Sequence, residues 1–204
     1  MRRIRKERNL RPSKPLLFGG GQTEYYYFSH LKQRRGYRVE IKPRFFVSDT
    51  AEEIEKYIQK CIFENRDAIC VYDKDITQWD EHQLAKFKEI EAKYKNHKHV
   101  LLCGSLPSIE YWFLIHYENT KRLFRTSKDV ITKLHKYIPR YAKTEKFLKN
   151  IAWVDNLLRN DGLSKACARA SETAPCGSSY TDIYKVIEKL EKNEEKIADV
   201  EKKL

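Results

Sequence analysis

The chain has 204 residues, of which 41% are hydrophobic and 34% charged, which is enough apolar material for one sizeable core and excludes a disordered segment. No stretch is long and apolar enough to span a membrane, and the N-terminus lacks the apolar segment of a secretion signal, so a cytoplasmic protein is expected. The five cysteines show no CxxC pair and no zinc-binding spacing, and their odd number without a signal peptide indicates a reducing compartment.

The formal net charge of +12 favours an anionic partner, with nucleic acid as the first candidate and an acidic protein or lipid surface as the alternatives. Half of this excess lies in residues 1–14, which contain seven basic side chains and one acidic side chain, Glu7. This basic N-terminal arm is either a solvated tail or a flexible segment that binds phosphate groups. In the second case its contacts would come from Arg2, Arg3, Arg5 and Lys6.

Strand and helix patterns alternate through the first half of the chain. In chain order the patterns predict a strand at 15–18, a helix at 23–33 that ends at Gly36, a strand at 37–41, a helix capped by Thr50, a strand at 68–72, a helix at 80–95 and a strand at 100–103. This alternation is typical of an α/β fold with a mostly parallel sheet flanked by helices.

The pattern changes to a helix-rich half without a clear strand after Pro107. Helices are predicted near 127–137, 143–158, 164–170 and 181–204, and the apolar stripe of the last one suits either the core or a partner helix in a homodimer. We therefore expect three regions: the arm at 1–14, an α/β core at 15–120 and a helical region at 121–204 packed on that core.

Acidic side chains follow three of the predicted strands, and ligands of open α/β sheets gather at the carboxyl ends of strands. Glu24 follows the first strand and its glycine loop, Asp73 and Asp75 follow the buried strand at 68–72, and Glu110 follows the strand at 100–103. Residues i and i+2 of an extended tip point the same way, so Asp73 and Asp75 can face one site. Hard oxygen ligands suit Mg²⁺ or Mn²⁺. The alternative is a polar loop with a helix-capping Asp.

Two other features have both a functional and a structural interpretation. The glycine loop at 19–21 could hold phosphate on its backbone N–H groups, or it is only a flexible turn into the next helix. His116 lies beside an aromatic run, where a histidine is more often a hydrogen-bonded core residue than a catalyst.

At these residues the sequence resembles the RloB-like family of bacterial defence-associated proteins, which have a Toprim-type fold. The most specific motif is Ser-x-Pro-x-x-Glu-x-Trp-x-x-x-His, here Ser105 to His116 with Trp112 inside it. The other motifs are Thr-Glu followed by Tyr-Phe at 23–28, Asp-x-Asp at 73–75, Tyr-x-Lys at 141–143 and Thr-x-x-Tyr at 181–184.

The resemblance implies a divalent metal site on a Toprim-like core at 15–120, with Asp73 and Asp75 as ligands. It also implies nucleic-acid cleavage and a role in phage defence beside an ATPase encoded nearby. One departure stands out: the usual Toprim pattern has Glu-Gly at the end of the first strand, whereas this chain has Gly19 and Gly20 there. Glu24 would have to replace that glutamate, or the catalytic step would be weakened or lost.

Two functions remain open from the sequence. The first is a Mg²⁺-dependent nuclease in which Asp73 and Asp75 hold the metal, Glu24 or Glu110 acts as a base or completes the metal shell, and the basic arm and Lys143 position the nucleic-acid backbone. Ser105, Trp112 and His116 would support this site. The second is a catalytically silent module that binds nucleic acid or regulates a partner. A nucleotide-binding regulator that uses the glycine loop is a weaker third hypothesis.

Overall fold

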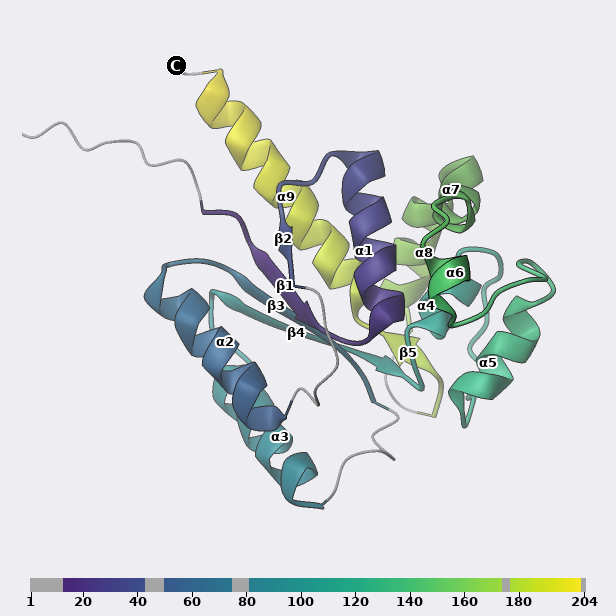
Figure 1. The fold of residues 1–204 in the computed structure, drawn as a ribbon, viewed down its shortest axis with the longest axis horizontal. Coiled ribbons are helices and arrows are strands. Elements are labelled where there is room, and N and C mark those ends of the chain that lie inside the picture. The colour runs from purple at the N-terminus through teal and green to yellow at the C-terminus, as the bar shows by residue number, and fades with distance from the viewer. Residues whose placement is uncertain (1–12, 43–49, 75–80, 174–176, 203–204) are drawn as a thin grey trace, which may run out of the picture.

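A five-stranded sheet lies at the centre of the molecule (Figure 1). The structure is a computed structural model and describes residues 13–42, 50–74, 81–173 and 177–202. The sheet has the strand order β2-β1-β3-β4-β5. Its four parallel members are β1 (Leu16–Gly19), β2 (Glu40–Ile41), β3 (Ala68–Asp73) and β4 (Val100–Leu106), and the antiparallel edge strand is β5 (Tyr180–Thr181).

Side chains of the central strands alternate between the two faces of the sheet, and both faces are buried. On one face Leu16, Phe18 and Cys70 pack under α2 (Ala51–Phe63) and α3 (Glu81–Tyr94). Helix α2 begins where the sequence predicts, because the Thr50 side chain accepts a hydrogen bond from the Glu53 N–H. These two helices form one outer layer (Figure 1).

The opposite face is covered by α1 (Gln22–Arg35) and α9 (Ile183–Glu201), with the remaining helices grouped beyond the carboxyl ends of the strands (Figure 1). That group contains α4 (Glu110–Ile115), α5 (Ser127–Leu134), α6 (Glu145–Leu148), α7 (Ala152–Leu158), the 3₁₀ turn η1 (Arg159–Asp161) and α8 (Gly162–Ser171). The apolar stripe of α9 faces this core, since Ile183, Val186 and Ile187 are all buried.

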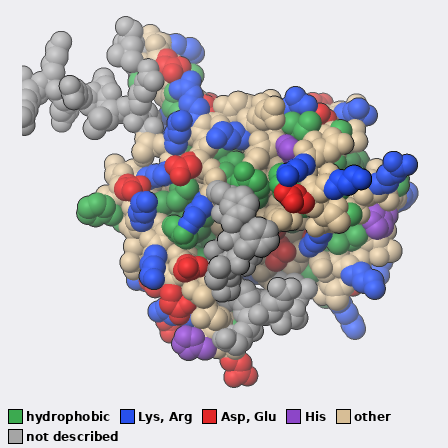
Figure 2. Space-filling model, in the orientation of Figure 1, with side chains coloured by type: hydrophobic (Ala, Val, Ile, Leu, Met, Phe, Trp, Pro, Cys, Tyr) green, Lys and Arg blue, Asp and Glu red, His purple; other side chains and the backbone are tan. Residues whose placement is uncertain are grey.

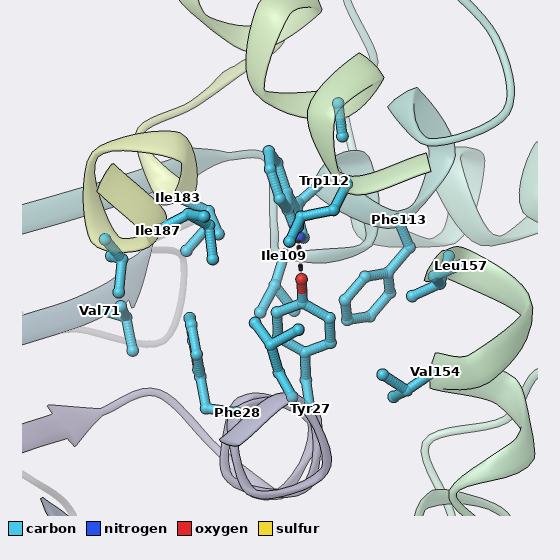
Figure 3. Packing of buried hydrophobic residues seen from close by; sticks show 14 of the residues in the cluster. Tyr27, Phe28, Val71, Ile109, Trp112, Phe113, Val154, Leu157, Ile183 and Ile187 are labelled. Carbon is cyan, nitrogen blue, oxygen red and sulfur yellow. Dashed lines mark hydrogen bonds between the residues drawn. The ribbon is translucent and has the colours of Figure 1, made fainter. Parts of the chain in front are cut away.

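An aromatic cluster joins α1 to the helical group (Figure 3). Tyr27 on α1 and Trp112 on α4 are fully buried, and the Trp112 indole N–H donates a hydrogen bond of 2.7 Å to the Tyr27 hydroxyl. The Phe113 ring lies 5.1 Å from that of Tyr27. Because this cluster contains side chains from 15–120 and from the later helices, the two expected regions share one hydrophobic core.

The predicted α/β class with a mostly parallel sheet is confirmed, and three local predictions were wrong. Of the strand predicted at 37–41, only Glu40–Ile41 forms a strand. The segment predicted as one helix at 143–158 forms two helices, α6 and α7. The strand β5 was not predicted, since two residues carry no periodicity. Within the described residues, no helix has the length and apolar character needed to cross a membrane.

Candidate functional site

Three carboxyl side chains come together where β1, β3 and β4 end. Glu24 lies in the first turn of α1 after β1, Asp73 is the last residue of β3, and Glu110 begins α4 after β4. Each interacts electrostatically with the others, and all three interact with Lys143. The expected gathering of acidic residues at the carboxyl edge of the sheet is present in the structure.

The glycine loop positions Glu24. The Gly21 N–H donates a 2.6 Å hydrogen bond to Oε2 of Glu24, which folds the side chain back over the end of β1. Gly19 and Gly20 have φ angles of 82° and 66°, a region that favours glycine. A Cβ atom at Gly20 would lie 2.5 Å from Cγ of Glu24. The loop therefore holds a carboxylate, and the Gly21 amide considered as a phosphate donor is already engaged by it.

Asp73 is fixed by the backbone of the next connection. Its Oδ1 accepts a 2.9 Å hydrogen bond from the Ile109 N–H, and its Cα is in register with that of Ser105 on β4. Burial, followed by the charges of Glu24 and Glu110, raises the pKa of Asp73 to about 8. Asp75, its expected partner, lies outside the described residues.

Glu110 is the most completely buried of the three carboxyl groups, with no exposed side-chain surface. Its Oε2 accepts a 2.6 Å hydrogen bond from the Ser108 hydroxyl, and its Oε1 accepts one of 2.7 Å from the Tyr141 hydroxyl. The Lys143 Nζ lies 3.0 Å from Oε1. A buried carboxylate with partners on both oxygens is held in one orientation.

The electrostatics show that the cluster is short of positive charge. Burial, followed by the charge of Glu110, raises the pKa of Glu24 above its ordinary value, even though Gly21 and Lys143 oppose the shift. Burial lowers the pKa of Lys143, but the surrounding carboxylates outweigh this effect and raise it overall. The site will therefore favour a bound proton or a cation. In the described part of the chain no group of three His, Cys, Asp or Glu side chains is arranged to hold a metal ion.

Among the described residues, three further predicted site residues do not join this cluster: Ser105, Trp112 and His116. Ser105 is within β4 and its hydroxyl is hydrogen-bonded to that of Thr181 at 2.8 Å. Trp112 belongs to the aromatic cluster. His116 is buried at the other end of α4, where Nδ1 is 2.9 Å from the Leu157 carbonyl oxygen. Burial lowers the pKa of His116 to about 4, so it is neutral, as expected for a core histidine. The arm residues Arg2, Arg3, Arg5 and Lys6 lie outside the described residues.

Sequence reasoning assigned no role at the site to Ser108 or Tyr141, which both hydrogen-bond Glu110. The Tyr-x-Lys motif could have indicated Tyr141, because it places this residue two positions before Lys143. In the structure both side chains reach Oε1 of Glu110. Ser108 gives a weaker signal, since only its spacing of two residues from Glu110 could suggest contact.

The sequence model of the RloB-like protein family matches residues 16–190. This chain belongs to the RloB-like family. The matched range begins at β1 and ends in α9, so it includes every described residue of the carboxylate cluster in this RloB-like protein. Comparisons with curated proteins and with solved structures gave no match.

Proposed function

We propose that this RloB-like protein is a metal-dependent nuclease that cleaves phosphodiester bonds in DNA or RNA in the cytoplasm, on a Toprim-like core, as part of phage defence. The observation that supports this proposal is the carboxylate cluster at the end of the parallel sheet, where burial and like charge raise the pKa of both Glu24 and Asp73. Keeping such groups together has a free-energy cost unless a cation occupies the site during function.

The donor chemistry fits Mg²⁺ or Mn²⁺. Asp73 and Glu24 offer hard carboxylate oxygens from two neighbouring strand ends, and Asp75 would add a third. A divalent ion bound there supplies the Lewis acidity that polarises a phosphodiester and activates water. Glu24 either completes the metal shell or acts as the general base, and Glu110 suits the second role less because it already has partners on both oxygens.

Lys143 and the basic surface supply the contacts for the nucleic-acid backbone. The Lys143 side chain is 42% exposed while its Nζ is paired to the buried Glu110, so it can also reach a phosphate oxygen at the site. Figure 2 shows Lys and Arg side chains over most of the visible face, with acidic side chains between them. The chain as a whole carries a net charge of +12, half of it in residues 1–14, so it attracts polyanions in a salt-dependent way. The basic arm would add further phosphate contacts.

The test is cleavage of labelled plasmid DNA, single-stranded DNA and total tRNA with Mg²⁺, Mn²⁺ or EDTA, by the protein alone and together with the ATPase encoded nearby. Wild type is compared with Asp73→Asn, which keeps an acceptor for the Ile109 N–H. Metal-dependent cleavage that is lost in the variant would support the nuclease and name its substrate. Equal cleavage by both proteins would contradict the assignment of Asp73.

A second candidate function is a silent module that binds nucleic acid or regulates its ATPase partner. Gly19 favours this alternative, because it replaces the glutamate of the usual Toprim pattern and a Cβ there would lie 2.5 Å from the Val71 carbonyl oxygen. Salt-sensitive binding of nucleic acid that persists in EDTA, without cleavage under any of the conditions above, would favour the silent module.

A further inference from the structure

A polar pocket of about 470 Å³ lies away from the carboxylate cluster, at the opposite end of α4 from Glu110. Its walls come from the residues that follow α4, from the segment after α5, from the end of α7, from the η1 turn and from α8. The pocket volume falls in the range of small-molecule sites, roughly 300–1,000 Å³. None of the functions considered above uses this pocket.

The charges in the pocket wall are all positive. Arg159, Lys165 and Arg169 line the pocket, and no lining residue is acidic. Within the described residues, none of these three cations forms an ion pair with a carboxylate. Lys165 and Arg169 instead donate hydrogen bonds of 2.7 Å to the backbone carbonyls of Asn160 and Ile115, which fixes them at the rim. Such an arrangement suits an anion, and guanidinium groups in particular suit phosphate.

The start of helix α8 adds to this positive field. Gly162 and Lys165, both in its first turn, line the pocket, and this turn contains no acidic residue. The preceding residue, Asp161, makes no side-chain hydrogen bond to the helix amides. The Gly162 N–H already donates to the Arg159 carbonyl oxygen, so this terminus can offer an anion only its later first-turn N–H groups and its partial positive charge.

Two buried polar atoms in the pocket wall also have no hydrogen-bond partner among the described residues: the Nε2 of His116 and the hydroxyl of Tyr117. Because the His116 Nδ1 must donate its proton to the Leu157 carbonyl, Nε2 of the neutral ring is an acceptor. Buried polar atoms are nearly always satisfied, so partnerless ones beside a pocket point to a ligand or ordered water there.

An aromatic pair completes the pocket. The rings of Tyr117 and Tyr137 stack with centroids 4.8 Å apart and planes 1° from parallel. The Tyr137 hydroxyl donates a 2.8 Å hydrogen bond to Glu118, which holds this ring in place. Flat aromatic surfaces beside basic groups are the combination that binds nucleobases and their phosphates.

We propose that this pocket, formed by Tyr117, Tyr137, Arg159, Lys165 and Arg169, binds a nucleoside phosphate. The phosphate lies among the basic groups and the α8 N-terminus, and the base lies against the tyrosine pair. The ligand is either a free mononucleotide or the phosphorylated end of a strand, since both present the same chemistry.

The test is isothermal titration calorimetry on the full chain with adenosine 5′-monophosphate, inorganic phosphate and a short oligonucleotide with or without a 5′-phosphate. We expect Arg159→Glu/Lys165→Glu to weaken nucleotide binding at least tenfold, and Tyr117→Phe to weaken it several-fold. Both charged residues are exposed, so the fold should persist. The matched control is Lys32→Glu/Lys56→Glu, which makes the same charge change on exposed residues of α1 and α2.

The possible outcomes distinguish a free mononucleotide from a strand end, and both from refutation of the proposal. Binding of the free mononucleotide that is lost only in the pocket variant supports a small-molecule ligand. Binding confined to the 5′-phosphorylated oligonucleotide, and lost in the same variant, supports a strand end. The proposal is overturned if nothing binds, if inorganic phosphate binds as tightly as the nucleotide, or if the pocket variant binds like wild type. Asp73→Asn should retain this binding, so the result does not depend on the nuclease proposal.

Discussion

The side chain of Glu24 occupies the space that a side chain at Gly20 would need. A Cβ atom built at Gly20 would lie 2.5 Å from Cγ and 2.8 Å from Cδ of Glu24. Glycine is favoured at position 20 for two reasons. Its φ is 66°, and the absence of a side chain lets the Glu24 carboxylate on α1 reach the end of β1. Because of this contact, Glu24 supplies an acidic group at the end of β1 although positions 19 and 20 are both glycine.

Replacing Gly20 with Ala should displace Glu24. We expect the variant to lose about 1–3 kcal/mol of unfolding free energy, from the left-handed backbone and the close contact. If Glu24 is needed for cleavage, activity should fall at least as far as in Glu24→Gln. The control is Gly177→Ala, which also has a positive φ (76°) but meets no atom within 4 Å. Equal activities of the two alanine variants would contradict a positioning role for Gly20.

The stability of the metal-free protein should depend on pH through Asp73. Its pKa rises from 3.8 to about 8 on folding, so the folded state binds more protons than the unfolded state between these values. Stability relative to Asp73→Asn should therefore fall as the pH rises from 4 to 8, by on the order of a few kcal/mol. Urea unfolding of both proteins in EDTA measures this difference.

The titration of Asp73 also allows the proposed metal site to be tested by melting temperature, without an activity assay. At the proposed site Mg²⁺ would compete with the proton on Asp73, so it should raise the melting temperature of wild type more at pH 8 than at pH 5. Asp73→Asn should show a much smaller effect at both values. An increase that is independent of pH, or equal in the two proteins, would show that Mg²⁺ binds elsewhere.

Removing the Tyr141 hydroxyl should loosen Glu110. We expect Tyr141→Phe to cost about 1 kcal/mol of stability and, if the chain is the proposed nuclease, to lower cleavage about 10–100-fold, as is typical of residues that orient a site. Tyr26→Phe is the matched control, because the Tyr26 hydroxyl donates to Glu145 in an exposed pair. Steady-state cleavage rates and thermal melts compare the two. A similar fall in rate for both variants would rule out a specific role for Tyr141.

Lys143 and Lys149 each pair with a glutamate, but in different surroundings. Lys143→Met leaves the buried Glu110 without its cation and should cost about 1–3 kcal/mol, below the full penalty of a buried pair because Lys143 is partly exposed. Lys149→Met breaks an exposed pair with Glu145 and should cost less than about 1 kcal/mol. Denaturant unfolding at neutral pH distinguishes them, and equal losses would mean that Glu110 tolerates the loss of its partner.

The sequence predicted the sheet well because its central strands are buried on both faces and therefore appear as continuous apolar runs, as at residues 68–72 of β3. The positions of Glu24, Asp73 and Glu110 followed from the rule that parallel strands end at one edge. The strand Tyr180–Thr181 could not be predicted, since it exists only through its pairing with Ser105 and Leu106, far away in sequence. The hydrogen bond from Tyr141 to Glu110 is likewise a tertiary contact between residues 31 positions apart.

Both edges of the described sheet are very short. Strand β2 pairs with β1 through two residues, and β5 pairs with β4 through two residues in the antiparallel direction. Long flat edges are the template on which separate chains join into continuous sheets. The two edge strands of the described residues offer little such template, so we expect copies that meet at high local concentration to associate through helices and side chains. Backbone-driven polymerisation, the usual hazard of an α/β sheet, should be slow for this chain.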